Sequence, residues 1–84
     1  VGIIQYVQES GIHIYPNPFI DVIHIRKTGV VITETIWISD FSGKKIGEYQ
    51  IKDEDTLIDL SELDSGMYIV HIFSSGIKIK ISKF

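Results

Sequence analysis

The chain contains no cysteine, which excludes disulfide bonds and thiolate metal sites and leaves the core alone to hold an 84-residue fold. A single core in a chain this short supplies about 3–5 kcal/mol of stability. No apolar run approaches the roughly 20 residues that a membrane-spanning helix needs. The formal net charge of −3 lacks the positive excess that nucleic-acid binding requires, so we expect no nucleic-acid partner.

The start of the chain has neither the basic residues nor the long apolar stretch of a signal peptide, and it has no initiator methionine. We therefore expect a piece of a longer protein. The charge is distributed unevenly along this piece. Seven of the eleven acids lie between Glu48 and Asp64, whereas the last twenty residues hold three lysines and no acid.

Isoleucine is the dominant apolar residue, and its β-branched side chain favours strands. No segment keeps a helical period over three turns. The alternation of apolar and polar residues instead predicts strands at residues 12–15, 21–26, 34–40, 44–51, 56–60, 66–73 and 77–83. Seven short strands separated by turn signals favour an all-β fold, an immunoglobulin-like antiparallel sandwich of two sheets.

Two local motifs support the sandwich. Asp40 and Gly43 frame a hairpin turn, since Asp suits its first position and Gly tolerates a positive φ. The spacing Leu63-x-x-Gly66-x-Tyr68 has the form of a tyrosine corner, in which the Tyr hydroxyl bonds a backbone group a few residues upstream. We expect this corner to fix the crossover before the sixth strand.

The sequence gives little support for catalysis or metal binding. His13, His24 and His71 lie on three different predicted strands, so we interpret them as half-exposed strand residues. The acidic stretch 53–55 lacks the spacing of a calcium loop and is interpreted as a solvated hairpin tip. No serine has a nucleophile context, and there is no phosphate loop or dinucleotide fingerprint. We expect no enzymatic activity, no metal and no cofactor.

Two sets of outward-facing side chains leave alternatives open. Trp37 and Phe73 could form a patch that stacks on sugar or peptide, or one of them could cover a sheet edge or contact a neighbouring domain. Lys78 and Lys80 could serve recognition or could block edge-to-edge aggregation. Lys83, beside the end of the chain, is explained better by recognition.

Four blocks of sequence occur in order from about residue 12 to residue 84. They are Tyr15-Pro16-Asn17-Pro18-Phe19 with Asp21-Val22-Ile23-His24-Ile25, then Ile38-x-Asp40-x-x-Gly43-Lys44, then Ile58-Asp59-Leu60-Ser61-x-Leu63-x-x-Gly66-Met67-Tyr68-Ile69-Val70, and finally Lys80-Ile81-Ser82-Lys83. Together these blocks resemble the C-terminal sorting domains of the type IX secretion system, found in Bacteroidetes.

The resemblance implies a domain at the end of a larger cargo protein, which reaches the medium or the cell surface by way of the periplasm and the outer membrane. The implied partners are the outer-membrane translocon, its shuttle protein and a sortase-like cysteine peptidase. This peptidase commonly removes the domain and joins the cargo to an anionic lipopolysaccharide. The domain would then be a substrate of the peptidase.

On this resemblance we expect residues 12–84 to form the sorting domain and residues 1–11 to be a linker to the cargo. Gly66, Tyr68 and Val70 are expected to build the motif that the translocon recognises. Contact is expected from Lys78, Lys80 and Lys83, with capture of an exposed strand edge as one mode. The residues expected to shape turns are Tyr15, Pro16, Asn17, Pro18, Asp40 and Gly43. Those expected to contain the cleaved bond are Val7, Gln8, Glu9, Ser10 and Gly11.

Two other readings of the sequence remain open. The chain could be an immunoglobulin-like binding or accessory module of a secreted enzyme or adhesin, with Trp37 and Phe73 as its patch. It could also be a structural spacer that forms a weak strand-swapped homodimer, with residues 2–5 pairing along the edge of a neighbouring copy.

Overall fold

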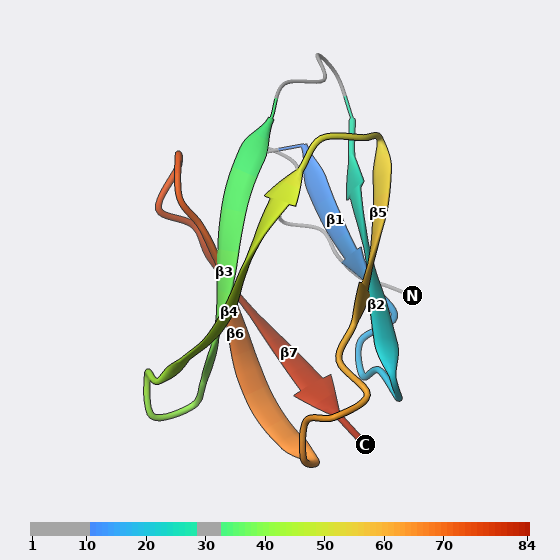
Figure 1. Ribbon diagram of the computed structural model, residues 1–84, viewed down its shortest axis with the longest axis vertical. Helices are drawn as coiled ribbons and strands as arrows, with labels where there is room; N and C mark the ends of the chain where they lie inside the picture. Colours follow the sequence, from blue (N-terminus) through green and yellow to red (C-terminus); the bar gives the residue numbers. More distant parts are fainter. Residues whose placement is uncertain (1–10, 29–32) are drawn as a thin grey trace.

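The computed structural model describes residues 11–28 and 33–84, and this part of the chain forms seven strands (Figure 1). They are β1 (Ile12–Tyr15), β2 (Val22–Lys27), β3 (Glu34–Asp40), β4 (Lys45–Ile51), β5 (Asp55–Asp59), β6 (Gly66–Ile72) and β7 (Lys78–Lys83). Every strand end lies within one residue of its predicted bound. No helix in the described residues has the length and apolar character needed to cross a membrane.

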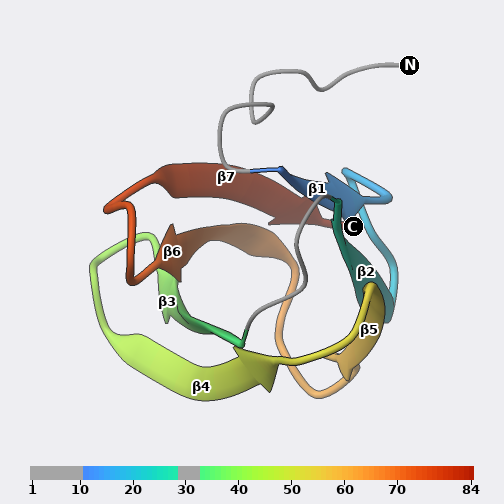
Figure 2. The same cartoon turned by 90° about the horizontal axis from the view of Figure 1, so that it is seen from above.

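The strands form two antiparallel sheets that face each other, as the view from above shows (Figure 2). One sheet has three strands in the order β1-β2-β5, and the other has four in the order β4-β3-β6-β7. The chain crosses between the sheets three times, from β2 to β3, from β4 to β5 and from β5 to β6. The predicted all-β, immunoglobulin-like sandwich is confirmed.

The core lies between the sheets and consists mainly of isoleucine. Ile36 and Ile38 of β3 are fully buried, whereas Trp37 between them faces outward, as predicted. Ile23 and Ile25 are buried in the same alternating way on β2. Full burial of such a side chain contributes about 1.5–3 kcal/mol, so this set offsets the absence of disulfide bonds. The buried apolar residues are Ile12, Phe19, Ile23, Ile25, Ile36, Ile38, Ile51, Ile58, Leu60, Tyr68, Val70, Ile72 and Ile81.

The turn between β3 and β4 forms where it was predicted. The Asp40 carboxylate accepts hydrogen bonds from the Ser42 hydroxyl (2.7 Å) and from the backbone N–H groups of Ser42 and Lys44 (both 2.9 Å). Gly43 has a φ of 99° and donates its N–H to the Asp40 carbonyl. Glycine suits this position because an L side chain rarely adopts a positive φ.

A buried ion pair joins the two sheets and was not predicted. Lys27 ends β2 and Glu34 begins β3, and the Lys27 Nζ and Glu34 Oε1 atoms lie 3.6 Å apart with side chains only 7% and 9% exposed. Removing one partner of such a pair typically costs about 3–5 kcal/mol, because the other charge stays buried. The pair therefore fixes the point where the chain passes from one sheet to the other.

Candidate functional site

The last strand, β7, forms one edge of the four-stranded sheet and pairs with β6 at each of its residues. On its inner face Ile81 is fully buried and Ile79 is half-buried against the core. On its outer face Lys78 and Lys80 are exposed. The predicted alternation is confirmed, so the strand is anchored by one face and presents cations on the other.

The edge of β7 that does not pair with β6 is covered by the segment that follows β1. Phe19 donates its N–H to the Ser82 carbonyl (2.8 Å), and its carbonyl accepts the N–H of Phe84 (3.0 Å). The Asn17 side-chain amide donates to the Lys80 carbonyl (3.2 Å) and accepts the Ser82 N–H (3.0 Å). The edge is therefore occupied from Lys80 to Phe84, and a partner strand could pair there only after displacing this segment.

The proline-rich turn of this segment contains two cis peptide bonds, Tyr15–Pro16 and Asn17–Pro18. The Tyr15 ring stacks on His24 with centroids 4.9 Å apart, and its hydroxyl donates to Asp55 (3.1 Å). Beyond the turn, Phe19 is fully buried in the core. The turn thus joins the edge of β7 to the three-stranded sheet.

The side chain of Lys83 reaches back to the corner between β5 and β6. Its Nζ donates hydrogen bonds to the carbonyl oxygens of Leu60 (3.0 Å), Ser61 (3.1 Å) and Leu63 (2.6 Å). The same corner contains the predicted tyrosine corner, because the Tyr68 hydroxyl donates to the Asp64 carbonyl at 2.6 Å. The end of β7 and the corner therefore hold each other in place.

The three residues expected to build the recognition motif all lie on β6. Tyr68 is 7% exposed and Val70 is fully buried, so neither presents its side chain to a partner of the folded domain. Burial raises the pKa of the Tyr68 hydroxyl, and Asp64 and Asp40 raise it further. Gly66 has a φ of 148°, which a glycine adopts without strain.

Comparison with protein families matches residues 13–84 to the secretion system C-terminal sorting domain, the terminal domain of type IX secretion. The chain belongs to this family. No curated protein matches the chain. Membership implies a larger cargo protein, the secretion machinery, and export of that protein to the cell surface or the medium.

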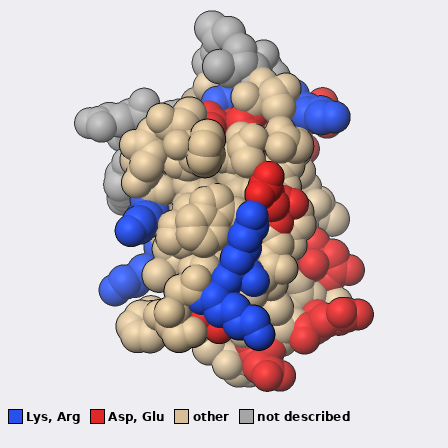
Figure 3. All heavy atoms as spheres, turned by 60° about the vertical axis from the view of Figure 1, so that its left-hand side comes forward, with Lys and Arg blue, Asp and Glu red and all other residues tan. Residues whose placement is uncertain are grey.

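Lys78 and Lys80 of the sorting domain lie on the outer face of its four-stranded sheet. Lys78 pairs with His71 of β6, and Lys80 pairs with Ile69. Figure 3 shows Lys and Arg side chains at the left, the centre and the upper right of one face. Asp and Glu lie mostly along its right and lower margins, with one acidic side chain directly above the central basic one.

The same outer face of the sorting domain carries a stacked aromatic pair. The Trp37 and His71 rings are parallel to within 1°, with centroids 3.6 Å apart, and Lys45 Nζ lies 6.0 Å from the Trp37 ring. Burial lowers the pKa of His71, and Lys78 lowers it further. Phe73 is 74% exposed and has no ring contact with Trp37 among the described residues. The two aromatic residues considered for one patch therefore do not stack on each other.

A serine and a histidine of the sorting domain meet on this face. The Ser39 hydroxyl and His71 Nε2 lie 2.9 Å apart. Ser39 is fully buried, so its hydroxyl offers no surface to a substrate. This hydrogen bond therefore orients the imidazole against Trp37.

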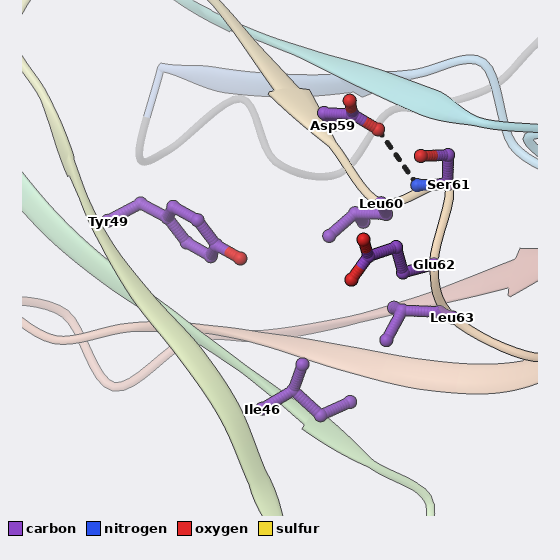
Figure 4. A pocket seen from close by; sticks show the side chains of 7 residues that line it. All are labelled: Ile46, Tyr49, Asp59, Leu60, Ser61, Glu62 and Leu63. Carbon is purple, nitrogen blue, oxygen red and sulfur yellow. Dashed lines mark hydrogen bonds between the residues drawn. The ribbon is translucent and has the colours of Figure 1, made fainter.

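The opposite edge of the four-stranded sheet borders an open hollow of about 310 Å³ (Figure 4). Ile46 and Tyr49 of β4 line one side, and residues of the β5–β6 corner line the other, with Tyr49 and Glu62 pointing toward each other across it. No sequence pattern indicated the hollow. The residues that line it are Ile46, Tyr49, Asp59, Leu60, Ser61, Glu62 and Leu63.

The structure leaves the histidines of the sorting domain on separate strands. His13 lies on β1, His24 on β2 and His71 on β6. Among residues 11–28 and 33–84, no group of three or more His, Asp or Glu side chains is placed to hold a metal ion. Of the expected cleavage region, Val7, Gln8, Glu9 and Ser10 lie outside the described residues, as do residues 2–5. Gly11 is tied to the fold through its carbonyl, which accepts the Thr28 N–H at 2.8 Å.

Proposed function

We propose that this domain directs a cargo protein through the type IX translocon by presenting Lys78 and Lys80 on a strand held fixed at its end. The shuttle protein and the translocon would read this face, and a sortase-like peptidase would then remove the domain and attach the cargo to the cell surface. The family supports the export step. The contact residues, the removal and the attachment are our proposal.

One observation favours recognition over protection of the strand edge as the function of these lysines. Lysine on an exposed edge blocks unwanted strand pairing. From Lys80 to Phe84 the edge is already occupied by Asn17 and Phe19, so Lys80 is not needed for that purpose. In the described part of the chain, neither Lys78 nor Lys80 forms an ion pair with an acid.

Exposed, unpaired cations suit an encounter with an acidic partner. They steer the approach and set the orientation of binding, while adding little to the stability of the free domain. Because the strand edge is covered, we expect the partner to dock on the outer face of the four-stranded sheet, beside Trp37 and His71. This places the contact on side chains and not on backbone pairing.

Export is tested with fusions to a periplasm-targeted reporter in a host that has this secretion system. One fusion carries residues 1–84, and a second lacks residues 77–84. We expect the first reporter to reach the surface or the medium and the second to stay in the periplasm. If both stay inside, or both escape alike, the chain is not an export signal and the binding-module reading replaces it.

Removal of the domain is tested by mass spectrometry of the fragment that is released. Gly11 is held by Thr28 and Ile12 begins β1, so a cut before Gly11 leaves the described fold intact. We expect the new N-terminus to fall between Val7 and Gly11. A domain that stays joined to an exported reporter would show that export proceeds without removal.

A further inference from the structure

All three N–H groups of the Lys83 ammonium donate hydrogen bonds within the domain. An ammonium has three N–H groups, and the carbonyls of Leu60, Ser61 and Leu63 accept all three at 3.0, 3.1 and 2.6 Å. Leu60 is buried in the core, at 3% exposed. The cage of carbonyls therefore belongs to a part of the fold that is itself firmly held. No donor of Lys83 is left for a partner in this arrangement.

Lys78 and Lys80 differ from Lys83 in this respect, because they are exposed and point away from the domain. We propose that Lys83 is a positioning residue: its ammonium fixes the end of β7 so that Lys78 and Lys80 are presented in register. This inference rests on the proposed function of those two lysines. It divides the three terminal lysines into two that make contact and one that holds the strand.

Register matters because β7 has opposite chemistry on its two faces. A slip of one residue against β6 would turn Lys78 and Lys80 toward the core and expose Ile79 and Ile81. At its start the strand is fixed by the hairpin, where Gly76 donates its N–H to the Ile72 carbonyl at 2.8 Å. At its other end the strand is fixed by the Lys83 ammonium, together with the backbone bonds from Phe19.

The decisive experiment asks whether a disulfide bond can replace the hydrogen bonds of the Lys83 ammonium. The reporter fusion carries Lys83→Met, which keeps the aliphatic stem and removes the ammonium. A second fusion adds Met67→Cys and Ser82→Cys, at positions directly opposite each other on β6 and β7, where a disulfide can form in the oxidising periplasm. A third carries the two cysteines with Lys83 intact.

We expect Lys83→Met to reduce export to near the level of the fusion that lacks residues 77–84. The disulfide should restore it, because the bond holds β7 in register without the ammonium. Normal export of Lys83→Met would overturn the proposal. So would failure of the disulfide to restore export when electrophoresis shows that the bond has formed, since Lys83 would then be needed for contact itself.

General loss of stability is controlled by Ile58→Val, which weakens the core on β5, away from the terminal strand. Its unfolding midpoint is compared with that of Lys83→Met, and we expect its export to stay normal at similar stability. Equal loss of export in the two variants would mean that Lys83 acts only through global stability, which contradicts a positioning role.

A measurement on the isolated chain separates this inference from the export hypothesis. In residues 1–84, Lys83→Met should speed hydrogen exchange of the Phe84 and Ser82 amides about ten- to a hundredfold, as expected when hydrogen bonds to a charged group are lost. Amides of β2 should exchange as before. If hydrogen exchange of the Phe84 amide is the same in Lys83→Met as in the wild-type chain, the positioning role is refuted, even when the wild-type fusion is exported.

Discussion

The two edges of the four-stranded sheet are protected in different ways. The β7 edge is covered by the segment Asn17–Phe19, which bonds Lys80, Ser82 and Phe84. Along β4, the structure of the described residues places no second backbone segment, and the edge borders the open hollow. One edge is thus closed by another part of the chain, whereas the other faces solvent.

The open edge carries the usual devices against strand pairing. The pairing of β3 with β4 shifts register between Ile38 and Ser39, and such an irregularity twists an edge away from a flat strand. Lys45 and Glu48 add charges, with Lys45 Nζ 2.6 Å from Glu48 Oε1. Charge therefore protects the β4 edge from strand pairing, whereas a covering segment protects the β7 edge from Lys80 onward and leaves the lysines for another use.

The largest expected effect comes from removing the anchor of the covering segment. Phe19 is fully buried, and Phe19→Ala should lower the free energy of unfolding by about 3–5 kcal/mol in urea denaturation. Its neighbour Ile20 is 65% exposed, so Ile20→Ala should change it by no more than about 0.5 kcal/mol. A similar small loss for both would mean that the segment does not anchor the edge.

Removal of the Asn17 side-chain amide, which bonds β7 through two hydrogen bonds, should have an intermediate effect on the free energy of unfolding. Asn17→Ala loses both bonds to β7, and we expect a loss of about 1–3 kcal/mol together with faster hydrogen exchange at the Ser82 amide. Asn17→Asp keeps the acceptor for the Ser82 N–H but loses the donor to the Lys80 carbonyl. It should therefore fall between the wild-type chain and Asn17→Ala. If Asn17→Asp were destabilised as much as Asn17→Ala, the two hydrogen bonds of the Asn17 amide would not be what stabilises the edge.

The difference between the two edges can also be tested by measuring self-association of the chain. Lys45→Thr with Glu48→Thr removes the charges from the open edge and should cause concentration-dependent association in sedimentation velocity, with unfolding changed by only about 0.5–1 kcal/mol. Lys78→Thr with Lys80→Thr should leave the chain monomeric, because the covering segment occupies that edge from Lys80 to Phe84. Association of both variants alike would remove the distinction between the edges.

The smallest effect concerns acid stability at the turn that begins β4. Hydrogen bonds from the Ser42 hydroxyl and from backbone N–H groups hold the pKa of Asp40 below its ordinary value. A lowered pKa in the folded state stabilises the fold above about pH 4, and this contribution is lost as the pH falls through the folded-state value. Asp40→Asn should therefore flatten the fall in unfolding midpoint between neutral and acidic pH.

The control for this pH series is Asp53→Asn. The carboxylate of Asp53 accepts no hydrogen bond in residues 11–28 and 33–84, so its replacement should leave the acid profile of the wild-type chain unchanged. A profile for Asp40→Asn that coincides with that of Asp53→Asn would contradict a stabilising role of the Asp40 carboxylate.

The features that the sequence predicts are those that depend on neighbours along the chain. The strands follow from alternating isoleucine, the turn from Asp40 and Gly43, and the tyrosine corner from the spacing of Leu63, Gly66 and Tyr68. Each involves residues only a few positions apart. Local chemistry alone therefore determines them.

The features that could not be predicted depend on distant residues. The Asn17 amide meets Lys80 and Ser82 more than sixty positions away, and Lys83 reaches carbonyls twenty or more positions upstream. Every residue has a backbone carbonyl, so the sequence does not show which carbonyls accept hydrogen bonds from a lysine. Sequence alone therefore could not distinguish the bound Lys83 from the exposed Lys80. The hollow beside Tyr49 is a product of how two sheets meet, which a strand pattern does not specify.

The central claim is that Lys78 and Lys80 are read by the secretion machinery from a folded domain. Its most direct test is the exported fraction of the reporter fusion with Lys78→Glu and Lys80→Glu, beside a fusion with Lys44→Glu and Lys52→Glu, two exposed lysines elsewhere on the surface. Both variants carry the same change of charge. We expect export to collapse in the first and to persist in the second, with both domains folded. Equal export of the two would contradict the claim.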